Sequence, residues 1–169
     1  MPTNKRWTLQ LFSDAYLSIE TRDVAVGASG VAYAIGQRAS RARLWLFRDA
    51  VWHLDQGLVG VGRTLCVARH PKSTDDIYAG GDRLWFRSDG DWLPLDGPTA
   101  LAGVQRLRAH GDNLFLITAK RVWRQDAPNR WHSRALPDAA EPGALWVSGN
   151  WVWVASIKGR AWRHHLQTF

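Results

Sequence analysis

A tryptophan-centred segment recurs along this sequence at a nearly constant interval. The four copies read RLWLFRD, RLWFRSD, RVWRQD and RAWRHH, and they contain Trp45, Trp85, Trp123 and Trp162. Successive tryptophans are 40, 38 and 39 residues apart. A unit of this length cannot bury its hydrophobic faces alone and does so by stacking against its neighbours. The interval therefore predicts a chain built from similar supersecondary units.

Two further series of aromatic residues share this period. One follows the first series after a short polar turn, and the other precedes it. The series that follows contains Trp52, Trp92 and Trp131, and the series that precedes contains Tyr33, Tyr78, Phe115 and Trp153. Each run alternates large apolar with small or polar residues between Gly, Asp, Asn or Pro, which is typical of short antiparallel strands. Further strands are expected at 23–27, 64–69, 104–110 and 144–149, so that each unit has four.

Four strands in a repeat of about 40 residues predict a β-propeller blade. We expect an all-β fold, a small β-propeller of four four-stranded antiparallel blades in one domain, residues 1–169. The blades are placed at 23–56, 64–96, 104–136 and 144–165. The last blade has three recognisable strands, and residues 5–11 are predicted to add the fourth and so close the ring. The alternative is an open half-ring that pairs with a second copy into eight blades.

The second unit, residues 65–95, resembles a known family of repeats. It contains a hydrophobic strand, the segment DIYAGG and a turn built from Ser88, Asp89, Gly90, Asp91 and Trp92. These features resemble the repeat of the sialidase-type, or BNR/Asp-box, propellers, although the turn is a shortened form of the pattern Ser-x-Asp-x-Gly-x-Thr-Trp. The resemblance implies the blade fold. It does not imply sialidase activity, which needs a six-bladed ring and a tyrosine nucleophile paired with a glutamate.

Signatures of catalysis and of metal binding do not occur in the sequence. Cys66, the single cysteine, lies between two apolar residues and is expected to be buried in the core. There is no Gly-x-Ser-x-Gly, Walker A or His-Glu-x-x-His motif. His164 and His165 would point to opposite faces of one strand, so they cannot chelate one ion. We predict no enzymatic activity, no metal site and no cofactor.

The 11 tryptophans divide into two groups. Nine fall on the repeat and are expected to fill the wedge between neighbouring blades. Trp146 and Trp151 are the exceptions, because Trp146 lies on the expected inner strand and Trp151 shares one strand face with Trp153. These two are the tryptophans that we predict to bind a partner.

The positive charge is concentrated in the last third of the chain. The formal net charge is +7, of which residues 106–169 contribute +6 through 10 basic and 4 acidic side chains. A positive patch attracts acidic partners and raises association rates. Arg106 and Arg108 alternate with Leu107, so they are expected on one side of an inner strand, near the propeller axis or rim. The predicted partner-binding residues are Arg106, Arg108, Arg121, Arg124, Trp146, Trp151, Arg160 and Arg163.

Three functions are compatible with this pattern. The first is a non-enzymatic protein-binding propeller that docks an acidic protein through its loops and basic rim, as a bacterial toxin-neutralising (immunity) protein would. The second is a lectin-like carbohydrate-binding propeller, which predicts near-equal sites although the loops differ between units. The third is a nucleic-acid-binding module, which a pI near 10.3 permits but no binding motif favours.

The expected location is the cytoplasm. The first residues lack the apolar core of a signal peptide, and no window approaches the roughly 18 apolar residues of a membrane span. We therefore expect no association with a membrane.

Overall fold

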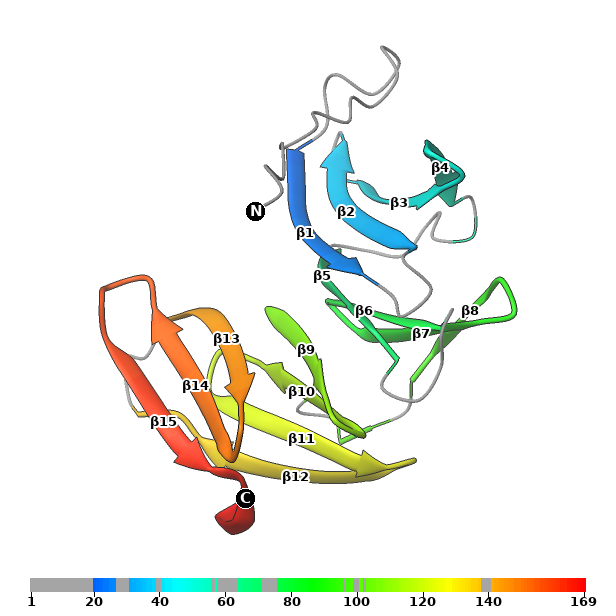
Figure 1. Cartoon of the computed structure of the whole chain (residues 1–169). Coiled ribbons are helices and arrows are strands. Elements are labelled where there is room, and N and C mark those ends of the chain that lie inside the picture. Colours follow the sequence, from blue (N-terminus) through cyan, green and yellow to red (C-terminus); the bar gives the residue numbers. More distant parts are fainter. Residues whose placement is uncertain are drawn as a thin grey trace, which may run out of the picture.

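The chain forms four antiparallel sheets that follow one another along an arc (Figure 1). This computed structural model describes residues 20–26, 31–38, 41–55, 57, 64–70, 76–95, 97–98, 101, 103–137 and 141–169. The predicted fold class is confirmed: the protein is all-β, and its sheets are arranged as a four-bladed propeller.

Each sheet is a meander in which consecutive strands pair. The first contains β1 (Glu20–Val26), β2 (Ala32–Arg38), β3 (Arg41–Arg48) and β4 (Val51–Asp55). The second contains β5 (Thr64–Arg69), β6 (Ile77–Gly81), β7 (Leu84–Ser88) and β8 (Asp91–Pro94). The third contains β9 (Arg106–His110), β10 (Asn113–Ile117), β11 (Arg121–Ala127) and β12 (Arg130–Ala135). The fourth contains β13 (Pro142–Ser148), β14 (Trp151–Ser156) and β15 (Ala161–His165), followed by the short 3-10 helix η3 (Leu166–Thr168).

The strands expected at the start of each unit are β1, β5, β9 and β13. They line the concave side of the arc, where β5 packs against β1 and β9, and β9 packs against β13 (Figure 1). Among the described residues the fourth sheet has three strands. The segment predicted to complete it, residues 5–11, lies outside the described residues.

Three hydrophobic clusters lie between neighbouring sheets. Tyr33 and Ile35 of the first sheet pack with Val67 and Ile77 of the second. The other two clusters join the second sheet to the third, and the third to the fourth. Because each of these sheets buries a face against its neighbour, the repeat is stabilised by blade-to-blade packing, as its period predicts.

The turns follow the sequence signals. Asp89 and Gly90 join β7 to β8 with φ values of 53° and 95°. Two consecutive positive φ values are characteristic of a type I′ hairpin turn, which an Asp-Gly pair favours.

The tryptophans of the repeat are buried to different degrees. Trp123 is 6% exposed and packs between the second and third sheets, as expected. Trp45 is fully buried, but it lies on the face of the first sheet that is turned away from the second sheet. Trp153 was also expected in this wedge, but it is 38% exposed. This prediction was wrong because no described residue of another sheet covers the face of the fourth sheet on which Trp153 lies.

Candidate functional site

The edge of the propeller formed by the third and fourth sheets carries a cluster of cations, which we call the basic rim. In an antiparallel meander the turn between the second and third strands lies at the same edge as the start of the first strand. The backbone confirms this, because Gln105 N donates to Ile117 O at 2.8 Å and Ile157 N donates to Glu141 O at 3.1 Å. The residues of the basic rim are Arg106, Lys120, Arg121, Lys158 and Arg160.

The cations of the basic rim differ in how they are held. Arg160 is exposed, and no carboxylate of the described residues lies within ion-pairing distance of it. Lys158 Nζ is 2.6 Å from Glu141 Oε1. Arg106 donates to the backbone O of Gln105 at 2.7 Å, and Arg121 Nε donates to Ser133 Oγ at 3.0 Å. Glu141 is the one acidic residue at this edge within the described parts of the third and fourth sheets, so the rim has a net positive charge.

The opposite edge of the sheets has a different charge pattern. Its turns carry Asp49, Asp89 and Asp112, and Asp126 lies near the end of β11. Asp126 accepts hydrogen bonds from Arg130 Nε at 2.5 Å and from His132 Nε2 at 3.1 Å. The hydrogen bond from Arg130 and the nearby positive charges hold the pKa of Asp126 below its usual value. Arg48 and Arg130 thus each lie beside a carboxylate at this edge, whereas the basic rim has an excess of cations.

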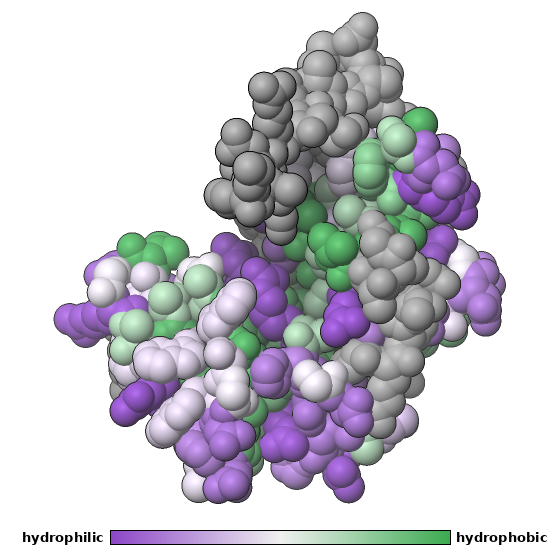
Figure 2. Space-filling model, viewed as in Figure 1, coloured by the Kyte–Doolittle hydropathy of each residue, from purple (hydrophilic) through white to green (hydrophobic). Residues whose placement is uncertain are grey.

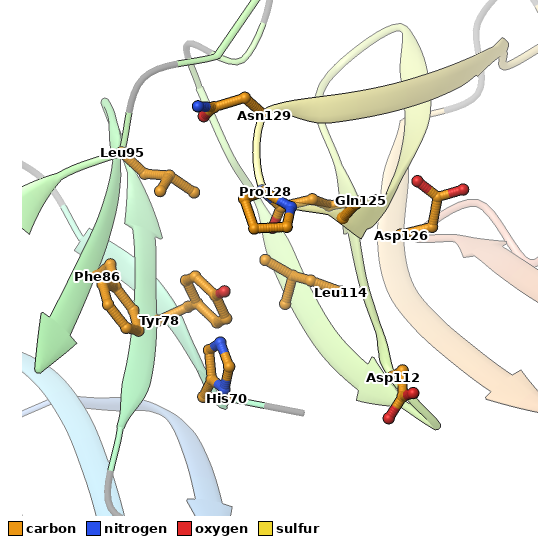
Figure 3. A pocket seen from close by; sticks show the side chains of 11 residues that line it. His70, Tyr78, Phe86, Leu95, Asp112, Leu114, Gln125, Asp126, Pro128 and Asn129 are labelled. Carbon is orange, nitrogen blue, oxygen red and sulfur yellow. The ribbon is translucent and has the colours of Figure 1, made fainter. Parts of the chain in front are cut away.

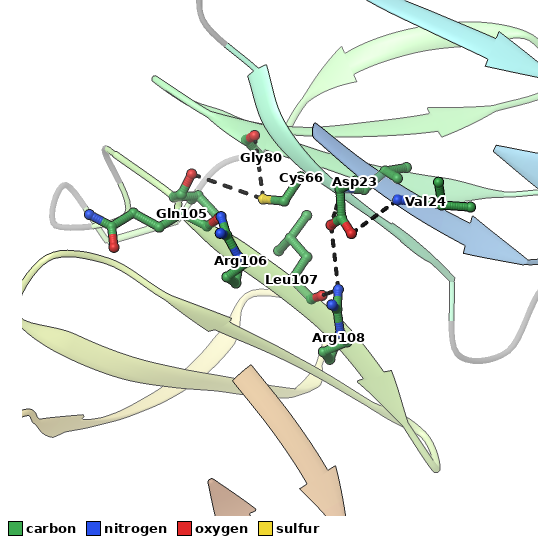
Figure 4. A network of polar contacts seen from close by, with 10 residues as sticks. Asp23, Val24, Cys66, Gly80, Gln105, Arg106, Leu107 and Arg108 are labelled. Carbon is green, nitrogen blue, oxygen red and sulfur yellow. Dashed lines mark hydrogen bonds and ion pairs between the residues drawn. The ribbon is translucent and has the colours of Figure 1, made fainter. Parts of the chain in front are cut away.

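Arg108, a predicted partner-binding residue, makes contacts that connect the inner strands (Figure 4). Its Nη1 lies 3.4 Å from Asp23 Oδ2 of β1 and donates to the backbone O of Leu107 at 2.7 Å. The same carboxylate oxygen accepts from Val67 N at 3.2 Å, so Asp23 joins β1, β5 and β9. Cys66 is buried beside this network, and burial raises the pKa of its thiol. A thiol that stays protonated is a poor nucleophile, which agrees with a core role.

Arg124, another predicted partner-binding residue, makes contacts within the chain. Its Nε donates to Asn113 Oδ1 at 3.0 Å, and its Nη1 donates to the backbone O of Leu166 at 3.2 Å. It therefore attaches the segment after β15 to the third sheet. Sequence periodicity could not reveal this role, because the two groups are 42 residues apart.

The fourth sheet presents an exposed aromatic face with one arginine. Trp146, Trp153 and Arg163 form one cross-strand row, and Trp151 lies on the same side of β14. The guanidinium of Arg163 lies 4.5 Å from the ring centroid of Trp151 and 5.6 Å from that of Trp153. Figure 2 shows pale side chains of intermediate hydropathy over this sheet. The sequence predicted Trp146, Trp151 and Arg163 as site residues, and the structure brings them together on this face.

A pocket between the second and third sheets was not predicted from the sequence (Figure 3). Its volume is about 240 Å³. One wall is aromatic, because the ring of His70 lies 5.4 Å from those of Tyr78 and Phe86. The other wall is mixed, with Gln125 and Asp126 beside the apolar Leu114 and Pro128. Burial and the nearby Asp76 raise the pKa of Tyr78 to about 12, so its hydroxyl keeps its proton at neutral pH. The segment HPKSTDDIYAGG contains His70 and Tyr78 of this wall, but sequence alone does not show what lies opposite them.

The described part of the chain bears on metal binding and on membranes in two ways. No group of three or more His, Cys, Asp or Glu side chains there is arranged to hold a metal ion. Within the same residues, no helix has the length and apolar character needed to cross a membrane.

Comparison with known proteins supports the fold. No protein-family model and no curated protein matches this sequence. Among solved structures, the chain is similar to the computationally designed Ika4 protein, with a TM-score of 0.60 and 13% sequence identity. The match covers 87% of this chain and 91% of the designed protein. A likeness at this identity shows a shared fold and says nothing about shared activity.

Proposed function

We propose that this protein is a non-enzymatic binding platform that docks an acidic protein on its basic rim. The observation that carries the proposal is the difference between the two edges of the sheets. One edge has Lys120, Lys158 and Arg160 on exposed turns with a single described carboxylate beside them, whereas Asp126 is paired with Arg130 and His132 at the other. An acidic surface gains most where cations are not already paired with carboxylates of the same chain.

The arginines of the basic rim suit this role geometrically. Arginine presents a rigid fork of donors that matches carboxylate groups bidentately. Arg106 and Arg121 are each held by a hydrogen bond within the chain, so less side-chain entropy is lost when they bind. Because the rim lies on turns supported by strands, a partner would meet a preformed surface.

The finer form of the proposal is a cytoplasmic, bacterial, toxin-neutralising protein. A single small propeller without a recognised catalytic motif suits a protein that acts by covering the surface of another. The BNR/Asp-box-like second unit, residues 65–95, supports the use of a propeller scaffold and implies no sialidase chemistry. In this form of the proposal the acidic partner is a toxin, encoded beside this protein and inactivated by it.

The test compares charge reversal at the two edges. Affinity capture from a lysate of the source organism, followed by mass spectrometry, identifies a candidate partner, whose binding is then measured with purified proteins. We expect the double variant Lys120→Glu, Arg160→Glu to lower the association rate constant at least about tenfold at low salt. The matched control, Arg48→Glu with Arg130→Glu, changes the net charge equally at the opposite edge and leaves the rate nearly unchanged. Equal losses in both variants, or a partner without an acidic surface, would contradict the proposal.

The pocket of Figure 3 supports a second candidate, a lectin-like carbohydrate site. An aromatic wall that faces a few polar groups is the usual composition of a small-ligand site. Calorimetric titration with common monosaccharides tests this idea. We expect binding that His70→Ala abolishes, that His110→Ala preserves, and that added salt hardly changes. Binding that falls steeply with salt and extends to single-stranded DNA would favour the nucleic-acid alternative instead.

A further inference from the structure

Neighbouring sheets meet at one shared position, where the end of the last strand of one sheet faces the third strand of the next. Between the first and second sheets, Asp55 of β4 meets Arg87 of β7, and its Oδ2 lies 2.8 Å from Arg87 Nε. Between the third and fourth sheets, Arg134 of β12 meets His164 of β15, and its Nε lies 3.4 Å from His164 Nε2. Both interfaces are thus joined at this position by a polar contact between side chains.

The interface between the second and third sheets differs at this position. The register places Leu95 there, because it lies opposite the residue before the repeat tryptophan, as Asp55 and Arg134 do. The residue that faces it is Gln125, two residues after the tryptophan of the third sheet. A leucine side chain has no hydrogen-bonding group, so it gives the carboxamide of Gln125 no partner. Both residues instead line the pocket of Figure 3.

Two polar groups on mostly buried residues lie at this pocket without a hydrogen-bond partner. Gln125 is 7% exposed and Tyr78 is 6% exposed. Within the described parts of the chain, neither the carboxamide of Gln125 nor the hydroxyl of Tyr78 makes a hydrogen bond. Figure 3 shows the Tyr78 hydroxyl pointing from the second sheet toward the third, and the Gln125 carboxamide pointing back. Because buried polar groups are nearly always hydrogen-bonded, a ligand that bonds to both would supply what the chain does not.

The hydroxyl of Tyr78 is not required by the repeat. Phe115 holds the equivalent position in the third sheet and is fully buried without a hydroxyl. The fold therefore needs only an aromatic ring at this position. Burial and the nearby Asp76 raise the pKa of Tyr78 to about 12, so at neutral pH its hydroxyl is able to donate as well as accept a hydrogen bond. The hydroxyl is thus a feature of the pocket that packing of the sheets does not explain.

The charged residues of the pocket determine which ligands it suits. The described lining includes Asp112 and Asp126 and contains no lysine or arginine. Arg130, which donates to Asp126, is not part of the lining. An anionic ligand would lose its hydration and meet carboxylates without a cation of the lining to pair with, which is unfavourable in a partly enclosed site. An uncharged ligand that carries hydroxyl groups does not meet this cost.

We propose that this pocket takes an uncharged pyranose ring, whose hydroxyl groups bond to the Gln125 carboxamide and the Tyr78 hydroxyl, and that it rejects sugar acids. The inference rests on the carbohydrate candidate above and adds to it the class of sugar and the two residues that select it. The apolar face of the ring packs on the aromatic wall, so that its hydroxyl groups reach the third sheet. A carboxamide presents a donor and an acceptor side by side, which matches two neighbouring hydroxyl groups.

Matched pairs of sugars test the selection by charge. Calorimetric titration compares the methyl glycosides of glucose and galactose with those of glucuronate and galacturonate, which differ from them only by a carboxylate at C6. We expect an uncharged sugar to bind, and its uronate to bind at least about tenfold more weakly. A uronate that binds as tightly would overturn this inference and leave the carbohydrate candidate standing. If no sugar of either kind binds, the carbohydrate candidate itself is wrong, and this inference with it.

Substitutions test the two selecting residues. Gln125→Leu and Tyr78→Phe each remove a polar group and keep most of the side chain. Because neither group has a partner in the described chain, the melting temperature should not fall, whereas the affinity for the uncharged sugar should fall at least about tenfold in each variant. The control Tyr33→Phe removes the hydroxyl at the equivalent position of the first sheet, outside the pocket, and should leave the affinity unchanged. Unchanged affinity in either variant would overturn the inference, and so would a loss of affinity that accompanies a lower melting temperature.

Discussion

The third and fourth sheets share one strand register but meet different surroundings. Across the third sheet one row reads Arg108, Phe115 and Arg124, and the equivalent row of the fourth sheet reads Trp146, Trp153 and Arg163. Phe115 is fully buried against the fourth sheet, whereas Trp153 is 38% exposed. The two arginines of the covered row bond to groups elsewhere in the chain, and Arg163 of the exposed row lies over two indole rings.

Position in the repeat therefore determines which way a side chain points, but it does not determine what covers that side chain. Both rows place a large aromatic residue at the centre of the sheet face. In the third sheet that residue contributes to the stability of a single chain, and in the fourth it remains available for another surface. Tryptophan and arginine are the residue types most enriched among residues that dominate binding energy at protein interfaces.

The largest expected difference between the rows concerns their central aromatic residues. Phe115→Ala should lower the free energy of unfolding by about 3–5 kcal/mol, because it leaves a cavity in a closely packed core. Trp153→Ala should cost about 1 kcal/mol or less in a single chain, because its ring is partly solvated already. Urea denaturation measures both values. Similar losses for the two variants would show that something covers Trp153 within one chain.

The inner-strand residues of the two rows, Arg108 and Trp146, should also differ in their contribution to the free energy of unfolding, but by a smaller amount. Arg108→Ala leaves the carboxylate of Asp23, which is 12% exposed, without its cation. We expect a loss of about 1 kcal/mol, discounted for the partial exposure of Arg108. Trp146→Ala should change the stability of a single chain by about 0.5 kcal/mol at most. Asp23→Asn on its own should reproduce the effect of Arg108→Ala, and the double variant should then cost little more than either one.

The sequence allowed the strands to be located but not the ends of the arc to be described. Tryptophans at a constant interval predicted β9 and β13 within two residues of their observed starts. The same series included Trp153 among the residues between blades, because periodicity treats all units alike. The curvature of the arc depends on the angles at which successive sheets pack, and no local pattern encodes those angles.

The residues of the candidate site were likewise predicted only in part. Trp146, Trp151 and Arg163 were recognised because they depart from the repeat or carry charge near its end. The contact of Arg108 with Asp23 was not predicted, because the two residues are 85 positions apart in the sequence. The pocket beside Tyr78 was missed because its two walls belong to different units, and each wall alone has the composition of an ordinary strand or turn.

An acid titration tests the paired edge of the third sheet. Arg130 and the nearby positive charges hold the pKa of Asp126 below its ordinary value of 3.8, so the native state binds this proton less readily than the unfolded state does. The resulting stability is fully present above pH 3.8 and is lost as the pH falls through the lowered native pKa. Asp126→Asn should cost about 1 kcal/mol at neutral pH and make unfolding less dependent on pH below 4. Glu141→Gln, at an exposed pair of the fourth sheet, should not change this dependence. If the pH dependence of unfolding were unchanged in Asp126→Asn, other carboxylates would be responsible for it.

The smallest expected effect concerns the exposed arginine of the fourth sheet. Arg163 lies over the rings of Trp151 and Trp153 without a described carboxylate at ion-pairing distance, and such a cation–π contact at an exposed site contributes about 0.5–1 kcal/mol. Arg163→Ala should therefore lower the free energy of unfolding by that amount and shift the fluorescence of the two indoles. Arg163→Lys keeps the charge and should recover part of both changes. The equivalent substitution in the covered row, Arg124→Ala, should cost more, because it removes two hydrogen bonds, one of which holds the segment after β15. Arg163→Ala could instead lower the free energy of unfolding more than Arg124→Ala does. That result would show that the aromatic face stabilises the fourth sheet within a single chain. The two rows would then differ in their residues and not in what surrounds them.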